Sequence, residues 1–254
     1  MRARPVVAII GLGLVGGSLA RALTRSGYRV IGVDRRAVRR RARAARAVAE
    51  TVASPVKAAS RADVVVLAAP PRANLRLLGR LARVRLSAVV ITDVGSVKAP
   101  ICREARRLHM DRFVGGHPMA GNERSGFGAS SATLFRGHPW ILTPAVPSSA
   151  DVRVVRRLVR VVGARPVVLT PAHHDRVTAF LSHVPQIASW AIRRTALGDA
   201  VTRRHLGLAG PGFRDMTRLA GSPRGLWREI LAQNRRETAR ALRGLVRRLD
   251  VHTS

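Results

Sequence analysis

Cysteine is nearly absent from this chain of 254 residues, with Cys102 as the single example. One cysteine cannot form an intrachain disulfide or supply a cysteine-based metal site, so we expect no bound metal. The lack of a disulfide framework also favours a reducing, cytoplasmic location.

A long apolar run is missing as well. The best candidate, residues 6–19, is interrupted by four glycines. It is also shorter than the roughly 20 apolar residues that a membrane-spanning helix needs. Two arginines precede this run, so it could be taken for a secretion signal. Because a strand-like segment follows it directly, we interpret it as part of a folded domain and expect no membrane partner.

Acidic residues are scarce: 14 stand against 46 lysines and arginines, and the formal net charge is +32. Such a charge is typical of proteins that bind nucleic acid. However, the arginines are spread over the whole chain, and aromatic residues make up only 4% of it, which leaves little material for base stacking. We therefore expect no specific nucleic-acid partner. The positive surface would attract a substrate that carries carboxylates.

Short apolar runs alternate with helical patterns over the first two thirds of the chain. Strands are expected at 6–10, 28–33, 63–67, 88–91, 140–142 and 165–169. Helices are expected at 18–26, 35–50 and 151–162. This alternation predicts an α/β fold, namely a Rossmann-type doubly wound parallel sheet with helices on both faces.

The pattern changes after Pro171, where no further strand is expected. Residues 174–194 and 223–249 are each predicted to form a helix, and the second has an apolar stripe opposite its arginines. We therefore predict a dinucleotide-binding domain over residues 1–171. A smaller all-helical domain, for substrate binding and dimerisation, is predicted over residues 172–254.

The segment GLGLVG at residues 11–16 matches the pattern G-x-G-x-x-G between the first expected strand and helix. Its glycines allow a tight turn, a close approach of the backbone to a pyrophosphate, and close packing of helix on strand. Asp34 ends the second expected strand and is suited to bind the ribose 2′-hydroxyl. NAD is therefore the predicted cofactor, and NADP stays open because Arg35 and Arg36 could hold a 2′-phosphate. The predicted cofactor-binding residues are Gly11, Leu12, Gly13, Leu14, Val15, Gly16, Asp34, Ala69 and Pro70.

Four further motifs follow in order: GSVK at 95–98, GGHPMAG at 115–121, SHVP at 182–185 and GFRDMTR at 212–218. With the glycine motif, their order and spacing resemble the prephenate/arogenate dehydrogenase family of tyrosine biosynthesis. The resemblance covers residues 6–234. It implies oxidative decarboxylation of prephenate to 4-hydroxyphenylpyruvate, with hydride transfer to NAD.

The resemblance assigns catalytic roles to two residues. His117 would accept a hydrogen bond from the substrate hydroxyl and assist its deprotonation, and the ordinary pKa of histidine, about 6.5, suits that role. Ser96 would hydrogen-bond both His117 and that hydroxyl. The structural alternatives are a histidine that stabilises the turn before Pro118 and a serine that caps a helix.

The resemblance also implies a set of substrate-binding residues. Arg218 would pair with a substrate carboxylate through its forked guanidinium. His174 and His183 match pocket histidines, but nine residues place them on roughly opposite faces of a straight helix, so one of them could be an ordinary packing residue. Glu123 and Trp227 match positions that line the pocket.

Several alternatives stay open. Many relatives have a second histidine where this chain has Gln186, and an amide carries no charge, so an arogenate dehydrogenase that makes tyrosine directly is the nearest alternative. A dehydrogenase of another substrate class would not need the GSVK and GGHPMAG motifs. A basic nucleic-acid-binding protein on a Rossmann core is the most distant alternative. By the same resemblance, we expect a homodimer formed through the C-terminal helices.

Overall fold

The structure is a computed structural model that describes residues 4–84, 86, 90–144 and 150–250. The chain divides into two compact units. The first unit comprises the chain up to Gly121 together with Ser125–His174, and the second comprises Asn122–Arg124 together with the chain from Asp175. The division falls inside helix α7 (Pro171–Thr178).

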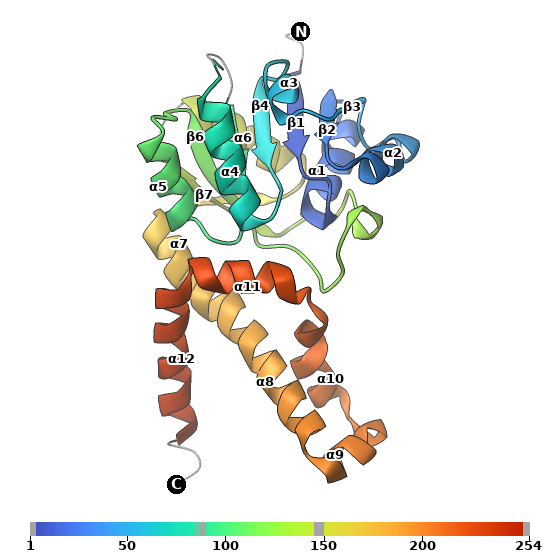
Figure 1. Ribbon diagram of the computed structural model, residues 1–254, viewed down its shortest axis with the longest axis vertical. Helices are drawn as coiled ribbons and strands as arrows, with labels where there is room; N and C mark the ends of the chain where they lie inside the picture. The colour runs from blue at the N-terminus through green and yellow to red at the C-terminus, as the bar shows by residue number, and fades with distance from the viewer. Residues whose placement is uncertain (1–3, 85, 87–89, 145–149, 251–254) are drawn as a thin grey trace. The chain divides into compact units, whose positions relative to one another are not determined.

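The first unit is built on one sheet with the strand order β3-β2-β1-β4-β5-β6-β7-β8, along which the helices pack (Figure 1). All neighbouring strands in the described chain run parallel except β6 and β7, which are antiparallel. The strands are β1 (Val7–Ile10), β2 (Val30–Val33), β3 (Glu50–Val52), β4 (Val64–Leu67), β5 (Val90–Asp93), β6 (Phe113–Pro118), β7 (Pro139–Pro144) and β8 (Arg165–Val168).

The helices of this unit lie between the strands in the sequence. They are α1 (Leu14–Arg25), α2 (Arg36–Ala44), α3 (Pro55–Ala59), α4 (Pro71–Ala82), α5 (Ala99–Arg107), the short η1 (Phe127–Ala129) and α6 (Ala150–Val161).

The two faces of the sheet belong to two separate cores. On β1, Val7 and Ile9 point into one core, whereas Ala8 and Ile10 point into the other. The first core includes buried residues of α1 and α6, and the second includes those of α3, α4 and α5. Because both faces are covered, the strands are apolar throughout rather than alternating. The predicted doubly wound α/β fold is confirmed.

The predicted helix over residues 35–50 is wrong in its second half. Helix α2 ends at Ala44, and Arg46 adopts a φ of 48°, a left-handed conformation that cannot continue a helix. Ala47 and Val48 are then buried in the core, and the unpredicted strand β3 begins at Glu50. Core packing here overrides the helical propensity of alanine and arginine.

The predicted strands are present with small shifts at their ends. Residue 88, where we expected one strand to begin, lies outside the described residues, and β5 runs from Val90 to Asp93. Strand β6 was not predicted, because its last four residues are the glycine-rich GGHP segment.

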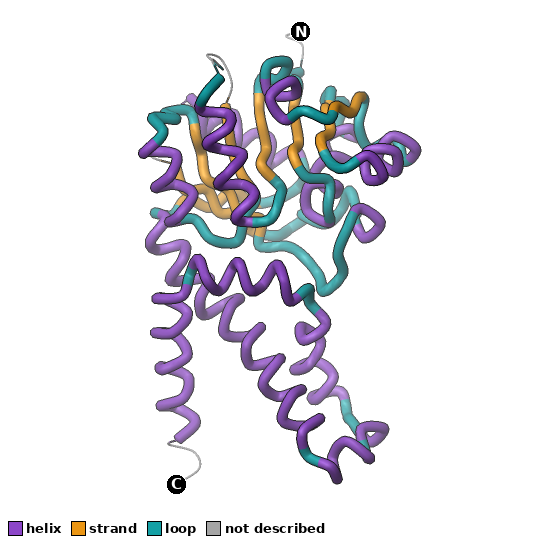
Figure 2. The backbone as a smooth tube through the Cα atoms, in the orientation of Figure 1, coloured by secondary structure: helices purple, strands orange, loops and turns teal. Residues whose placement is uncertain are grey.

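The second unit consists of helices and their connecting loops within the described residues (Figure 2). It contains the end of α7, then η2 (Ala179–His183), α8 (Val184–Gly198), α9 (Ala200–Arg204), η3 (Leu206–Leu208), α10 (Pro211–Thr217), η4 (Arg218–Gly221), α11 (Arg224–Gln233) and α12 (Arg235–Asp250). None of the helices in the described chain is long and apolar enough to cross a membrane.

Asn234 breaks the single helix that we predicted over residues 223–249 into α11 and α12. It is buried, and its Nδ2 donates to the carbonyl oxygen of Asp175 at 2.7 Å. We infer that the hydrogen bond of this buried side-chain amide stabilises the break more than a continuous helix would stabilise the chain.

Replacing Asn234 by alanine removes the shorter, 2.7 Å hydrogen bond to the Asp175 carbonyl oxygen and keeps the longer contact from Thr178 Oγ1 at 3.4 Å. We expect the free energy of unfolding to fall by about 1–3 kcal/mol, measured by urea denaturation. The exposed neighbour Arg235 provides a control, since Arg235→Ala should change stability by less than about 0.5 kcal/mol. Equal effects of the two substitutions would contradict this account.

Candidate active site

The glycine motif forms a tight turn at the carboxyl end of β1. Gly11 has a φ of +103°, and a Cβ there would lie 2.6 Å from the carbonyl carbon of Ala68. A Cβ on Gly16 would lie 1.9 Å from the carbonyl oxygen of Gly11. By contrast, a Cβ on Gly13 would meet nothing within 4 Å. The turn is therefore closed against β4 and α1 but open over Gly13, where a dinucleotide fold places the pyrophosphate.

Helix α1 begins directly after Gly13, with no side-chain cap and no acidic residue in its first turn. Its first backbone N–H groups and its dipole therefore favour an anion. At the end of β2, the Asp34 carboxylate accepts hydrogen bonds from the backbone N–H groups of Leu12 at 2.7 Å and Arg35 at 2.6 Å. These contacts fix the carboxylate beside the turn, so the residues present fit a bound dinucleotide.

The loop after β4 contains the other two expected cofactor residues. The backbone N–H of Ala69 donates to Oδ1 of the buried Asn74 at 3.1 Å. Pro70 is the N-cap of α4. Both residues follow a strand that is the direct neighbour of β1, so they lie at the same edge of the sheet as the glycine turn.

A buried ion pair connects β5 and β6 at the same edge of the sheet. The side chains of Lys98 and Asp93 are 0% and 1% exposed, and Lys98 Nζ donates to Asp93 Oδ2. Lys98 Nζ also donates to the carbonyl oxygen of Gly116 at 2.8 Å. The Asp93 carboxylate accepts from the backbone N–H groups of Gly95 at 2.8 Å and Gly116 at 3.0 Å. The pair thus fixes the backbone beside Ser96 and His117.

Close packing explains why glycines stand beside this ion pair. A Cβ on Gly116 would lie 2.5 Å from the carbonyl oxygen of Asp93, and one on Gly115 would lie 2.2 Å from Thr143 Oγ1. A side chain at either position would therefore push β6 away from its neighbours. Glycine therefore stands at two consecutive positions of this strand because no residue with a side chain fits there.

His117 is held by a second histidine. It is the fifth residue of β6 and is 7% exposed, and its Nδ1 lies 2.8 Å from Nε2 of His174 in α7. His174 is fully buried. For Nε2 of His117 to accept a proton, Nδ1 must carry the hydrogen of the neutral ring and donate it to His174 Nε2. That hydrogen bond would also persist in the imidazolium form of His117, so the contact with His174 fits a base at Nε2.

The structure places Ser96 on the loop between β5 and α5, half-buried. The N-cap of α5 is Lys98, so the helix-capping alternative for Ser96 is wrong. The hydroxyl makes none of the hydrogen bonds found among the described residues, and Nδ1 of His117 is bonded to His174 instead. The expected bond from Ser96 to His117 is therefore not observed.

His183 lies in the second unit, fully buried. Its Nδ1 is 3.1 Å from the amide Nδ2 of Asn234 and 3.3 Å from Thr238 Oγ1. Because the amide nitrogen is a donor, His183 Nδ1 is an acceptor, and its hydrogen is on Nε2. Its ring meets Trp227 edge to face, with centroids 6.0 Å apart. His183 and Trp227 are thus brought together.

Arg218 and Glu123 also come together in this unit. Arg218 Nη1 lies 3.5 Å from Glu123 Oε2, and their side chains are 57% and 38% exposed. This contact could not be predicted from the sequence. The Asn122–Arg124 segment directly follows the GGHPMAG motif of the first unit, but it belongs to the second unit.

The segment between the two pocket histidines is not the straight α-helix that we assumed. Residues Ala179–His183 form a π-helical turn between α7 and α8, which changes the angular relation of residues on either side. Both histidines are buried, His174 in the first unit and His183 in the second. His174 contacts His117, and this contact makes it a support for the catalytic candidate.

Asp93 and Lys98 belong to one sequence motif, but the sequence analysis assigned a role to neither of them. A signal was present, since Lys98 is one of two lysines in an arginine-rich chain. Lysine and aspartate beside an apolar strand indicate a buried pair, but nothing in the spacing alone predicts that they meet.

Comparison with known proteins agrees with this geometry. Residues 19–169 match the family model described as the nucleotide-binding domain of prephenate dehydrogenase, and residues 170–252 match that of its dimerization domain. The chain belongs to the prephenate dehydrogenase family. The resemblance inferred from the motifs is thereby confirmed, and the family consists of oxidoreductases.

Individual relatives cover nearly the whole chain. A prephenate dehydrogenase of Lactococcus lactis is 33% identical over 96% of this chain and 69% of its own length. The solved prephenate dehydrogenase of A. aeolicus, in complex with hydroxyphenyl propionate and NAD+, is 30% identical with a TM-score of 0.89, covering 98% of this chain and 89% of that one. The arogenate dehydrogenase of Synechocystis is 31% identical with a TM-score of 0.80, covering 96% and 89%.

The buried ion pair gives a stability prediction. Asp93→Asn leaves the Lys98 ammonium buried opposite a neutral group, and we expect a loss of about 3–5 kcal/mol in the free energy of unfolding. Adding Lys98→Met removes the uncompensated charge, so the double variant should be more stable than Asp93→Asn alone. Urea denaturation of both variants measures this, and a double variant less stable than the single one would rule out the assigned pairing.

Proposed function

We propose that this chain is a prephenate dehydrogenase that converts prephenate to 4-hydroxyphenylpyruvate by NAD-dependent oxidative decarboxylation. The observation that carries the proposal is the buried His117–His174 pair at the sheet edge that also bears the glycine turn. A histidine base whose Nδ1 is hydrogen-bonded to a second imidazole, beside a dinucleotide-binding turn, suits removal of a hydroxyl proton with hydride loss.

The proposed cofactor is NAD, the dinucleotide named for the A. aeolicus relative. Gly11–Gly16 and the N-terminus of α1 would hold the pyrophosphate, Asp34 would bind the adenine ribose, and Ala69 and Pro70 would line the same edge. When bound, NAD supplies the hydride acceptor. The Asp34 carboxylate disfavours the 2′-phosphate of NADP by like-charge repulsion.

His117 has the central proposed role. Nε2 of its neutral ring would accept the proton of the substrate hydroxyl, while Nδ1–H stays bonded to His174. Ser96 is a half-buried residue on the loop fixed by Asp93 and Lys98, and its hydroxyl would donate to or accept from the same substrate hydroxyl. Both side chains orient the reacting group, and proximity of this kind lowers the entropic part of the barrier.

Arg218 is the proposed partner of a substrate carboxylate, and Glu123, His183 and Trp227 are proposed to line the same pocket. The Arg218–Glu123 ion pair spans 3.5 Å between exposed side chains, and such solvent-screened pairs contribute little. A carboxylate that binds the guanidinium through two hydrogen bonds is therefore a stronger partner for Arg218.

Arogenate, which differs from prephenate in its side chain, is the alternative substrate. Gln186, at the family position of a second histidine, is fully buried, and its Nε2 donates to the carbonyl oxygen of Leu219 at 2.7 Å. An uncharged amide engaged with the backbone provides no cation for the side-chain carboxylate of either substrate. We favour prephenate because the Lactococcus and A. aeolicus relatives carry that name.

The second unit is also proposed to form a homodimer, in a cytoplasmic enzyme. Large apolar side chains that are exposed in the described chain lie almost entirely in residues 177–249, with Val167 as the exception. They include Leu181 at 69% and Leu208 at 82% exposure. Exposed apolar patches of this kind mark interaction surfaces. Light scattering after size exclusion should give twice the chain mass, and a monomer at micromolar concentration would contradict the proposal.

The proposed activity is tested by following reduced-cofactor formation with prephenate or arogenate, each with NAD or NADP. We expect turnover with prephenate and NAD, and His117→Ala should lower kcat by about 10²–10⁴-fold. Folded protein with no turnover in any combination would overturn the proposal. Turnover with arogenate alone would favour the alternative substrate.

Arg218 gives a second kinetic prediction. Arg218→Gln removes a charged hydrogen-bond partner of the substrate, so KM for prephenate should rise by roughly 10–100-fold. Arg214, on neighbouring α10, bonds the carbonyl oxygen of Ala209 and no other group among the described residues, so Arg214→Gln should leave KM within about twofold. Steady-state kinetics measure both, and equal KM increases would refute the assignment.

A further inference from the structure

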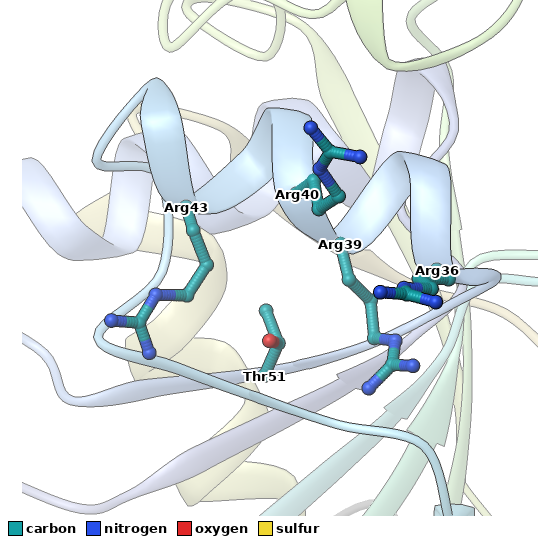
Figure 3. Close-up of a pocket in the computed structure, with 5 residues that line it drawn as sticks. All are labelled: Arg36, Arg39, Arg40, Arg43 and Thr51. Atoms are coloured by element: carbon teal, nitrogen blue, oxygen red, sulfur yellow. The ribbon is translucent and has the colours of Figure 1, made fainter.

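Four arginines occupy one face of helix α2. Arg36, Arg39, Arg40 and Arg43 line a hollow together with Thr51 of β3 (Figure 3). Their spacing of three, four and seven residues places them on a single helix face. We call these four residues the arginine stripe, and seven residues at 1.5 Å each make it about 10 Å long.

The charges of the arginine stripe are not compensated by ion pairs with the residues that the structure describes. None of the four guanidinium groups takes part in an ion pair found in the described part of the chain. Glu50, the neighbour of Thr51 in β3, pairs with Arg61 and Arg29. The hydrogen bonds from Arg61 lower the pKa of Glu50, so that carboxylate is ionised and already engaged.

Arg39 provides a second, independent observation. Its side chain is half-buried, and its Nε is buried with no hydrogen-bond partner among the described residues. An unsatisfied buried donor is costly. In Figure 3 its guanidinium lies beside that of Arg36, and Thr51 lies between Arg39 and Arg43. An anion in the hollow would satisfy the donor and relieve the repulsion between like charges on one helix face.

We propose that the arginine stripe binds an oligophosphate, a small anion with two or more phosphate groups, at a site separate from the dinucleotide site. Guanidinium forks match phosphate oxygens in pairs. In Figure 3 the Arg40 guanidinium is directed away from Thr51, and the remaining forks, which extend from Arg36 to Arg43 over about 10 Å, still exceed what one phosphate can engage. The hydroxyl of Thr51 adds a neutral donor between the charges.

Two other ligands, NADP and nucleic acid, would use the arginine stripe differently. The 2′-phosphate of NADP would use the end of the stripe at Arg36, two residues after Asp34, and would leave Arg43 without a role. Nucleic acid would be held by arginines along the whole chain, so its affinity would depend on any arginine of α2 alike.

The test is calorimetric titration of the full-length protein with inorganic tripolyphosphate at 0.15 M salt. We expect one saturable site, weakened about tenfold or more by Arg39→Gln or by Arg43→Gln. Arg41 is an exposed arginine of the same helix that does not line the hollow. Arg41→Gln removes the same charge and should weaken binding less than about twofold.

Two further measurements separate the occupants. Saturating NAD should leave the affinity for tripolyphosphate unchanged, because the two sites are distinct. Without ligand, Arg39→Gln and Arg43→Gln should melt at or above the temperature of the unmodified protein, since repulsion is removed, which separates lost binding from lost folding. The proposal is overturned by equal weakening in Arg41→Gln, by the lack of a saturable site, or by displacement of tripolyphosphate with NADP but not with NAD.

Discussion

The ion pair between Asp93 and Lys98 joins the two strands that bear the catalytic candidates. Three further hydrogen bonds link the pair to Gly95 and Gly116, the residues directly before Ser96 and His117. A buried pair of this kind is not in itself a strong source of stability, because desolvation offsets much of the attraction. The pair instead fixes the backbone geometry. Separating the two buried charges would leave each one uncompensated at a high free-energy cost, so the conformation in which they meet is strongly favoured.

Charged side chains have different roles in different parts of the first unit. At the sheet edge, scarce carboxylates have structural tasks: Asp93 holds β5 to β6, and Asp34 holds the glycine turn. On α2, by contrast, arginines stand together without carboxylates. The net charge of +32 is therefore not one uniform property of the surface. The arginine stripe lines a hollow with Thr51, and specific anion binding is proposed for that cluster.

Motifs with a steric cause were predictable from the sequence. The glycine turn, the apolar parallel strands and the helical second unit follow from periodicity and from positions that only glycine can occupy. Strand β3 and the end of α2 were not predictable, because Ala47 and Val48 enter a core formed by residues distant in the sequence. The contact of His117 with His174 was also out of reach, since 57 residues separate them and a π-helical turn alters the phase of the helix that follows.

The most direct test of the account is the dependence of kcat/KM for prephenate on pH in the unmodified protein and in two variants of His174. Because His117 must be neutral to accept a proton, activity should fall as pH is lowered through one protonation step. His174→Leu should shift that step and lower kcat, and His174→Gln, whose amide oxygen can accept from His117 Nδ1–H, should restore both in part. An unchanged profile and kcat in His174→Leu would contradict the central claim that a fixed histidine tautomer carries the reaction.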